Sequence, residues 1–198
     1  MIALKSPFRP AARADAAELA ELANFAGEGL PLYLWERMKA PGETAWEHGR
    51  GRAERETGSF SYRNAVIGEI GGKCAACLIG YPQPDEPEPI DYDTMPPMFV
   101  PLQELENLAP GTWYVNVLAA YPEYRSLGFG TRLLGIAEDI ARENRKTGLS
   151  IIVSDANHGA RRLYLRCGYR EAGERRKVKE SWENEGRSWV LLTKGIRL

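Results

Sequence analysis

The stretch from Tyr114 to Arg145 constrains the fold of this chain more than any other. It opens with the run Asn-Val-Leu-Ala-Ala at 116–120, which predicts a buried strand, and continues through a Pro-containing bend into Arg-Ser-Leu-Gly-Phe-Gly-Thr at 125–131. The apolar residues that follow have helical spacing and are Leu133, Ile136, Ala137, Ile140 and Ala141. A helix is therefore predicted to begin between Gly128 and Thr131, where its first N–H groups lack intrahelical partners and its dipole is positive. Because glycine lets a ligand come close to the backbone, this strand, turn and helix start predict a site for a phosphate or diphosphate group.

The spacing of the glycines excludes two better-known phosphate-binding loops. A dinucleotide-binding fold requires G-x-G-x-x-G, and Leu133 stands where that pattern needs its third glycine. A Walker loop ends in Gly-Lys-Ser/Thr, whereas Gly130 is followed directly by Thr131. The pattern that is present is R-x-x-G-x-G.

Length and composition limit the remaining possibilities. With 198 residues, of which 43% are hydrophobic, the chain can bury a sizeable core and is expected to form a single domain over residues 1–198. Its formal net charge of -1 favours neither nucleic acid nor a membrane surface as a partner. No run of about eighteen apolar residues occurs, so no membrane helix is expected. The N-terminus lacks an apolar signal core, so the expected location is cytoplasmic. Three cysteines do not form a disulfide framework.

The rest of the chain alternates between helical and strand-like segments. Two strand-like runs joined by Gly71 and Gly72 predict a hairpin. An acidic, Pro-rich insert at about 82–110 is too long for an ordinary loop and is expected to be functional or partly ordered. Further helices are expected after a cap at Asp15 and at 30–39, 44–55 and 157–167, and strands at 8–10, 62–70, 73–81, 112–120, 149–154, 169–180 and 187–193. This order implies an α/β fold with a mixed sheet and helices on both faces.

A second motif follows the first. The segment Asn-His-Gly-Ala-Arg-Arg-Leu-Tyr at 157–164 has the form N-x-x-A-x-x-x-Y and is followed by Cys-Gly-Tyr at 167–169. Together with R-x-x-G-x-G, in the expected order and at the expected separation, it resembles the signature of the GNAT superfamily of N-acetyltransferases, from roughly residue 111 to the C-terminus. One departure is Ser126, where the family has glycine. Binding through the backbone does not depend on that side chain.

The resemblance implies an α/β (α+β) architecture with a mostly antiparallel, six- to seven-stranded sheet that splays between its central strands, where acetyl-CoA fills the gap. It implies that the central-strand backbone pairs with the pantetheine arm, that the amides of the turn hold the diphosphate, and that Arg125 shapes the turn. Asn157 is expected to contact the pantetheine region, and Tyr164 to direct its hydroxyl at the thioester sulfur. The cofactor-binding residues so implied are Leu118, Ala119, Ala120, Arg125, Ser126, Leu127, Gly128, Phe129, Gly130, Thr131, Asn157 and Tyr164, and no metal is expected.

Helical spacing gives an independent view of Tyr164. Ala160, Leu163, Tyr164 and Cys167 share one face of the expected helix, so Tyr164 should point inward with Leu163 and Cys167 in the core. An inward phenol needs a partner for its O–H. That partner is either a departing thiolate, as the resemblance implies for a catalytic Tyr164, or a backbone group, as in an ordinary core tyrosine.

The resemblance also implies that an amine attacks the acetyl carbonyl directly, without an acetyl-enzyme. None of the three cysteines lies at an obvious helix start beside a basic residue, where a reactive thiolate would be stabilised. A central-strand N–H near Val117 or Leu118 would hold the oxyanion. An amine is an ammonium at neutral pH, so a base is required. Glu28, Asp155 and the acidic insert are the open candidates.

Several features allow two interpretations each. Cys74 and Cys77 form a C-x-x-C pair, interpreted as structural because residues three apart on a strand face opposite sides. The acidic insert either steers a cationic substrate or is a solvated loop. Trp35 either packs in the core or forms part of an aromatic wall around an amine. A basic C-terminal part includes Arg161, Arg162 and Arg166, any of which could meet the 3′-phosphate of CoA.

The predicted function is therefore acetyl transfer from acetyl-CoA to a primary amine of a small molecule. The alternatives are a protein N-terminal or lysine acetyltransferase and a non-catalytic acyl-CoA sensor on the same fold. No nucleic acid and no membrane is expected as a partner. The chain is expected to be a monomer or a homodimer.

Overall fold

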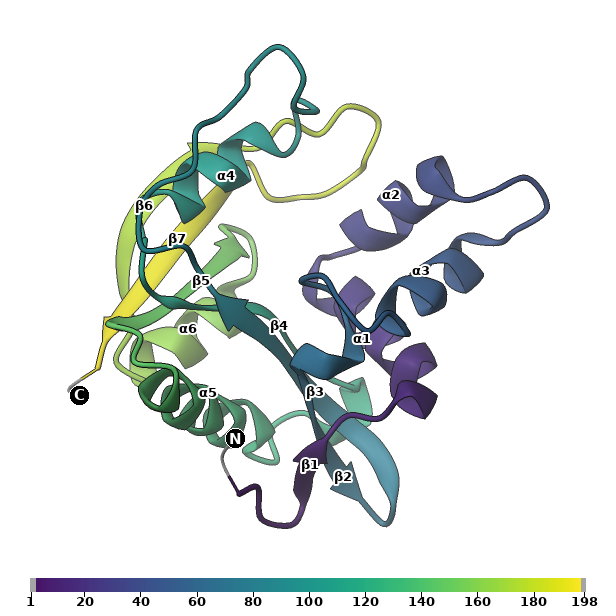
Figure 1. Ribbon diagram of the computed structural model, residues 1–198, viewed down its shortest axis with the longest axis vertical. Coiled ribbons are helices and arrows are strands. Elements are labelled where there is room, and N and C mark those ends of the chain that lie inside the picture. The colour runs from purple at the N-terminus through teal and green to yellow at the C-terminus, as the bar shows by residue number, and fades with distance from the viewer. Residues whose placement is uncertain (1–2, 197–198) are drawn as a thin grey trace. The chain divides into compact units, whose positions relative to one another are not determined.

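The computed structural model describes residues 3–196, in which seven strands form one sheet in the order β1-β2-β3-β4-β5-β7-β6 (Figure 1). The strands are β1 Phe8–Pro10, β2 Ala65–Ile70, β3 Lys73–Pro82, β4 Trp113–Ala120, β5 Gly148–Ser154, β6 Arg170–Arg176 and β7 Ser188–Gly195. The helices are α1 Ala16–Ala26, α2 Leu30–Met38, α3 Ala45–Ala53, α4 Val100–Glu106, α5 Phe129–Glu143 and α6 His158–Arg166. β4 and β5 pair in parallel, whereas β1 with β2, β2 with β3, β5 with β7 and β6 with β7 pair in antiparallel fashion. The predicted mixed, mostly antiparallel sheet is confirmed.

The contacts divide the described chain into two compact units. One comprises residues 82–115 and 136–196, and the other comprises residues 3–81 and 116–135. β4 and α5 each pass from one unit into the other, so each unit contains a part of both. The single domain expected from the sequence stays a prediction. None of the helices in residues 3–196 has both the length and the apolar character needed to cross a bilayer.

The unit that contains β1, β2 and β3 carries helices on both faces of its strands. Ile67 of β2 packs in a buried cluster with Leu19 and Leu22 of α1. The next residue, Gly68, faces the ring of Phe129 at the start of α5. Because consecutive strand residues point to opposite faces, α1 and α5 cover opposite sides of β2. This arrangement confirms the expectation of helices on both faces.

The same unit corrects three details of the sequence analysis. Asp15 precedes α1, but its carboxylate does not cap that helix and instead accepts from the N–H of Ala12 at 2.7 Å. β2 begins at Ala65 because residues 62–64 form a short 3-10 turn. A β-bulge beside Gly68 skips one residue of β3, so Cys74 and Cys77 lie on the same side, against the α1 cluster. The prediction that the two thiols face opposite sides was therefore wrong.

The acidic insert belongs to the other unit and contains a helix, α4, that the sequence analysis did not predict. Two backbone hydrogen bonds join the start of the insert to its end: Gln83 N donates to Thr112 O at 2.8 Å, and Gly111 N donates to Pro84 O at 2.7 Å. α4 packs on β6 and β7. Leu108 lies so near Gly173 that a Cβ there would be 2.7 Å from its Cδ1. The insert is thus an ordered cover of the C-terminal hairpin.

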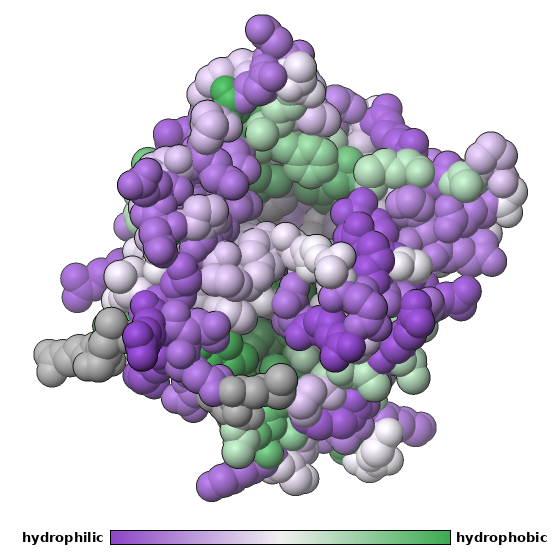
Figure 2. Space-filling model, viewed as in Figure 1, coloured by the Kyte–Doolittle hydropathy of each residue, from purple (hydrophilic) through white to green (hydrophobic). Residues whose placement is uncertain are grey.

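That hairpin is formed by β6 and β7, as predicted, but β6 ends at Arg176 rather than near residue 180. The next residue, Lys177, is 7% exposed and turns its ammonium inward. Its Nζ donates to Ser154 Oγ and to Asn184 Oδ1, each at 2.7 Å, and lies 4.1 Å from the ring centroid of Trp189. These contacts hold the loop after β6 against the end of β5. On the face shown in Figure 2, hydrophilic residues predominate and hydrophobic ones form small separate patches.

Candidate functional site

The turn before α5 is the most distinctive part of the candidate site. Ser126 and Gly128 have positive φ angles of 64° and 83°, which give the chain a sharp change of direction. Residues 125–128 are exposed. The first bond of the helix runs from Arg132 N to Gly128 O at 3.2 Å. Within residues 3–196, no main-chain N–H between Leu127 and Thr131 donates to another backbone carbonyl. The predicted anion site therefore consists of an exposed turn with a row of unused donors at a positive helix end.

Two side chains fix this turn to its own unit. Arg125 Nε donates to the carbonyl of Ala120 at 3.4 Å, so the arginine links the turn to the end of β4. Phe129, only 5% exposed, meets the ring of Phe8 edge-on with centroids 5.9 Å apart and an interplanar angle of 82°. The exposed amides thus belong to a segment whose aromatic side chain is buried. No pattern in the sequence predicts this contact between Phe129 and β1.

The three β4 residues predicted to bind pantetheine, Leu118, Ala119 and Ala120, are half-buried. Val117 is buried in the α1 cluster, and Ala119 packs against it. Leu118 and Ala120 therefore point to the opposite side of the strand. This end of β4 follows the two positions at which the strand is paired with β5, Trp113 with Leu149 and Tyr114 with Ser150.

The other predicted residues lie in the unit that contains α6. Asn157 caps α6 as predicted, with its Oδ1 accepting from Ala160 N at 3.1 Å. Tyr164 is 5% exposed and is the buried residue of this helix. Leu163 and Cys167 are only half-buried, so the prediction that both belong to the core was wrong. α6 has only nine residues, and Tyr164 is its one buried residue. The buried face of the helix is therefore narrower than the spacing of Ala160, Leu163, Tyr164 and Cys167 predicted.

The hydroxyl of Tyr164 forms no hydrogen bond with any group in residues 3–196. The ring lies beside that of Tyr169, with centroids 5.9 Å apart. Burial raises the pKa of Tyr164 above its ordinary value, so the phenol is protonated at neutral pH. The alternative of a core tyrosine bonded to the backbone finds no acceptor. The side chain is a buried proton donor without a partner of its own.

Two of the three thiols, Cys74 and Cys77, do not provide a nucleophile. Burial raises the pKa of Cys74 to about 12, and it raises the pKa of the fully buried Cys77 well above its ordinary value. A thiol in such surroundings stays protonated and inert near neutral pH. No group of three or more metal-ligating side chains occurs in the part of the chain that the structure describes.

The candidate bases Asp155 and Glu106 differ in the direction of their pKa shifts. Burial acts to raise the pKa of Asp155, but main-chain donors outweigh it and the pKa is lowered; one of them, Arg187 N, lies at 2.9 Å. A carboxylate that is already stabilised in this way is a weak base. Glu106, in the acidic insert, has a raised pKa because it is buried, although its bond from Gln83 Nε2 at 2.8 Å acts the other way. Sequence reasoning named the insert as a whole and did not single out Glu106.

Two acidic groups of the insert pair with basic side chains that follow it in the sequence. Glu104 and Arg175 form an ion pair at 2.6 Å, and Asp85 pairs with Lys146 at 2.8 Å. These pairs weaken the interpretation of the insert as a steering surface. Arg161 bonds to Glu171 and to the carbonyl of Asp155, whereas Arg162 and Arg166 are exposed. The latter two are better placed to meet a phosphate from solution.

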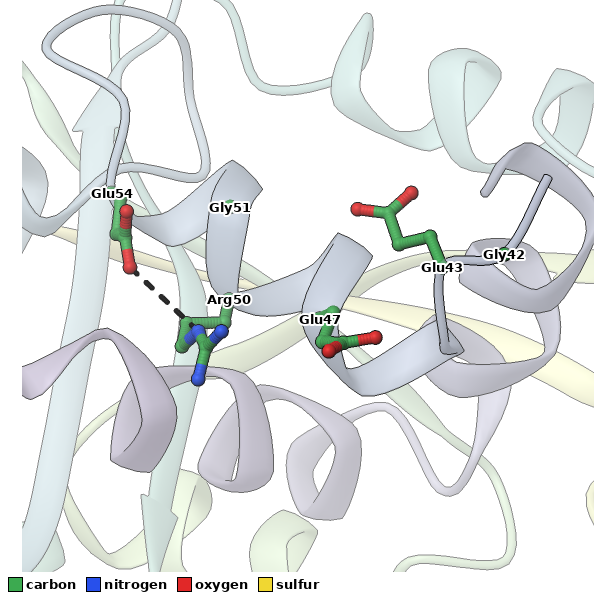
Figure 3. A pocket seen from close by; sticks show the side chains of 6 residues that line it. All are labelled: Gly42, Glu43, Glu47, Arg50, Gly51 and Glu54. Atoms are coloured by element: carbon green, nitrogen blue, oxygen red, sulfur yellow. Dashed lines mark ion pairs between the residues drawn. The ribbon is translucent and has the colours of Figure 1, made fainter. Parts of the chain in front are cut away.

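A shallow pocket of about 420 Å³ lies on α3 and the segment before it, lined by Gly42, Glu43, Glu47, Arg50, Gly51 and Glu54 (Figure 3). Its three carboxylates outnumber its one guanidinium, which lies 3.8 Å from Glu54. Glu47 also completes the cap of α3 by accepting from Thr44 N at 2.8 Å. This pocket repels a diphosphate and is explained by helix capping and surface ion pairs. Nearby, Trp35 is 4% exposed and stacks on Phe60, so it packs in the core.

Comparisons with known proteins identify a family and a shared fold. A model of the acetyltransferase (GNAT) family matches residues 31–169. A crystal structure described as an acetyltransferase is 20% identical, with 97% of this chain and 100% of that chain covered and a TM-score of 0.66. An N-acetyltransferase from Staphylococcus aureus Mu50 is 17% identical, with 96% and 100% covered and a TM-score of 0.63.

A third similar structure is a GNAT family acetyltransferase from Elizabethkingia anophelis with acetyl-CoA bound. It is 18% identical, with 67% of this chain and 75% of that chain covered and a TM-score of 0.50. At these identities the structures show a shared fold. No curated protein sequence matches this chain.

Proposed function

The chain belongs to the GNAT family of acetyltransferases, and we propose that it transfers an acetyl group from acetyl-CoA directly to the primary amine of a small molecule. The observation that carries this proposal is the row of unpaired main-chain N–H groups between Leu127 and Thr131 at the start of α5. Such a row matches the diphosphate of a nucleotide, because several donors and a positive helix end converge on one anion.

In this proposal the binding residues act mainly through the backbone. Ser126, Leu127, Gly128, Phe129, Gly130 and Thr131 hold the diphosphate, and Arg125 keeps the turn in place from its bond to Ala120. Leu118, Ala119 and Ala120 pair with the pantetheine arm along β4. Asn157 contacts the same arm with its side-chain amide N–H group, because its oxygen caps α6. A cosubstrate held in this way presents its thioester beside β4.

The reaction forms one C–N bond and breaks one C–S bond. The amine attacks the carbonyl carbon, and a β4 N–H near Val117 or Leu118 stabilises the oxyanion. When the C–S bond breaks, Tyr164 donates its proton to the leaving thiolate, which is possible because its hydroxyl is protonated and unbonded. The amine loses its proton to a base, and Glu106 of the insert is the candidate, because burial raises the pKa of its carboxyl group.

Burial raises the pKa of both Cys74 and Cys77, which supports direct transfer over an acetyl-enzyme formed on either of these two thiols. The unbonded Tyr164 hydroxyl favours an enzyme over a non-catalytic sensor, because a sensor has no need of a buried proton donor. The preference for a small-molecule acceptor over a protein amine, the cytoplasmic location and the monomeric or homodimeric state belong to the proposal as well.

A thiol-release assay tests the proposal. Purified protein is incubated with acetyl-CoA and a panel of primary amines that includes amino acids, polyamines, aminoglycosides and peptides, and free CoA and N-acetylated products are measured. We expect amine-dependent CoA release for one class of small amines. Turnover of peptides alone would favour a protein acetyltransferase, and binding without turnover would favour a sensor. Calorimetry that detects no affinity for CoA or acetyl-CoA would refute the whole proposal.

A further inference from the structure

Gly68 lies in the middle of β2, far in the sequence from either motif, and it faces the turn before α5. A Cβ built on Gly68 would be 2.7 Å from both Cδ1 and Cε1 of Phe129 and 3.0 Å from Cε1 of Phe8. Real Cβ atoms essentially never approach other atoms within 3.0 Å. The Phe129 ring therefore occupies the space that a side chain at residue 68 would need.

The backbone conformation does not explain this glycine. Gly68 is not among the residues with positive φ, so any L-residue could adopt its conformation. Glycine weakens a strand interior, because it costs conformational entropy and offers no side chain to pack. Close approach of another group is the usual compensation. Here the approaching group is the aromatic ring of the proposed binding turn.

The ring of Phe129 is held from more than one side. Phe8 meets it edge-on, and Arg132 lies over the Phe8 ring at 4.5 Å from its centroid. β1 is in turn fixed to β2 by Arg9, whose Nε donates to Glu69 at 2.8 Å. Phe129 is thus the fixed point of a turn whose neighbouring residues are exposed. Because the ring is buried between Phe8 and Gly68, a displacement of the ring also acts on the backbone that carries it.

We propose that Gly68 is a positioning residue for the diphosphate-binding amides of the turn, acting through the ring of Phe129. This inference rests on the proposed function, because it assigns the turn to CoA. A methyl group at residue 68 would require the ring to move by about 0.7 Å, from 2.7 Å to the 3.4 Å of an ordinary contact. Hydrogen bonds to an anion depend on distances of about 2.7–3.2 Å, so the same shift misaligns several of the donors at once.

The test measures CoA binding by calorimetry for Gly68→Ala and for a matched variant, Gly135→Ala. Gly135 lies on α5 itself and a Cβ there would meet nothing within 4 Å, so its variant controls for a glycine replacement in the same unit. We expect Gly68→Ala to weaken CoA binding about tenfold, the loss expected when roughly one hydrogen bond to a charged group is misaligned. Gly135→Ala should bind CoA within twofold of the wild type.

A double-variant cycle distinguishes this role from a merely structural one. Phe129→Ala should weaken CoA binding, and adding Gly68→Ala to it should cause little further loss, because the contact is already gone. If Gly68→Ala alone does not fold, the double variant has room for the methyl group and should fold. Equal CoA affinity of the wild type and Phe129→Ala, or an undiminished effect of Gly68→Ala in the Phe129→Ala background, would overturn the inference.

The two proposals fail in different ways. If the wild-type protein does not bind CoA, the proposed function fails whatever Gly68 does. If the wild type binds CoA and Gly68→Ala binds it equally well, the positioning role alone is wrong. Thermal unfolding measured on the same samples shows that each variant is folded at the temperature of the binding experiment.

Discussion

Replacing Tyr164 with phenylalanine separates catalysis from stability in a way that the structure makes specific. The substitution removes one oxygen from a side chain that is 5% exposed and leaves the ring in place. That oxygen forms no hydrogen bond in the described chain, so its loss leaves no other group unsatisfied. We expect the free energy of unfolding to change by less than about 0.5 kcal/mol, which is a shift in Tm of about 2 °C or less for a chain of this size.

The expected effect on the rate is much larger. A positioned general acid contributes about 10²- to 10⁴-fold. Burial raises the pKa of Tyr164 above that of an ordinary phenol, whereas a thiol has a pKa of about 8.5, so full proton transfer to the thiolate is uphill. The benefit should therefore lie near the lower limit, at about a hundredfold in kcat, or about 2.7 kcal/mol. For the same reason ionisation of Tyr164 should not reduce the wild-type rate up to about pH 10.

The neighbouring tyrosine supplies a matched control. Tyr169 lies 5.9 Å from Tyr164 between ring centroids, is 2% exposed, and also has a hydroxyl without a partner. Tyr169→Phe should therefore have a similar effect on Tm and leave kcat within about twofold. The assay is amine-dependent CoA release at saturating acetyl-CoA, with Tm measured on the same preparations. Unchanged turnover of Tyr164→Phe, or equal losses for the two variants, would refute the assignment of Tyr164 as the acid.

Three further outcomes follow from buried or paired groups. Lys177→Met loses two charge-assisted bonds of 2.7 Å and a contact with an aromatic ring; we expect a loss of about 3 kcal/mol and a fall in Tm of roughly 6–12 °C, and an unchanged Tm would contradict this. Cys74 and Cys77 should react only slowly with Ellman's reagent at pH 8 in the native protein, because burial raises the pKa of Cys74 to about 12 and also raises that of Cys77. Fast reaction of all three cysteines would be evidence against this. Burial acts to raise the pKa of Asp15, but hydrogen bonds from Arg9 and Ala12 lower it overall. The stabilising effect of the Asp15 carboxylate is therefore present above the unfolded-state pKa and is lost as the pH falls through the folded-state pKa. Asp15→Asn should lower the free energy of unfolding at pH 7 but not near pH 2, and a pH-independent difference would show that the charge is not responsible.

The parts of the fold that the sequence predicted well are those set by local patterns. The helical spacing after Gly130 placed α5, and Asn157 capped α6 as its position indicated. α4 escaped prediction because its seven residues are shorter than the window that periodicity requires and lie in a Pro-rich segment. The faces of Cys74 and Cys77 were wrong because the bulge that reorients them is a property of the β2–β3 pairing.

The candidate site also has parts that a local sequence pattern predicts and parts that depend on contacts between distant residues. The turn could be predicted because main-chain binding needs glycine at fixed positions, and glycine is visible in a sequence. The pairing of Glu104 with Arg175 joins residues 71 positions apart, and that of Asp85 with Lys146 joins residues 61 apart. No local pattern contains such pairs. The acidic insert therefore looked like a one-signed surface in the sequence, although basic residues elsewhere in the chain neutralise part of it.

The contact between Gly68 and Phe129 extends this reasoning to the motif itself. The amides of the turn have no side chain to orient them, so their positions depend on whatever holds the backbone, and the buried ring of Phe129 does so here. The ring fits only because residue 68 lacks a Cβ. R-x-x-G-x-G with phenylalanine at 129 and glycine at 68 therefore form one functional unit. A variant with alanine at position 129 should tolerate a side chain at position 68. Conversely, if R-x-x-G-x-G with its phenylalanine is placed in a chain that has a larger residue than glycine at the position of Gly68, that chain should bind CoA poorly although both glycines of the motif are present.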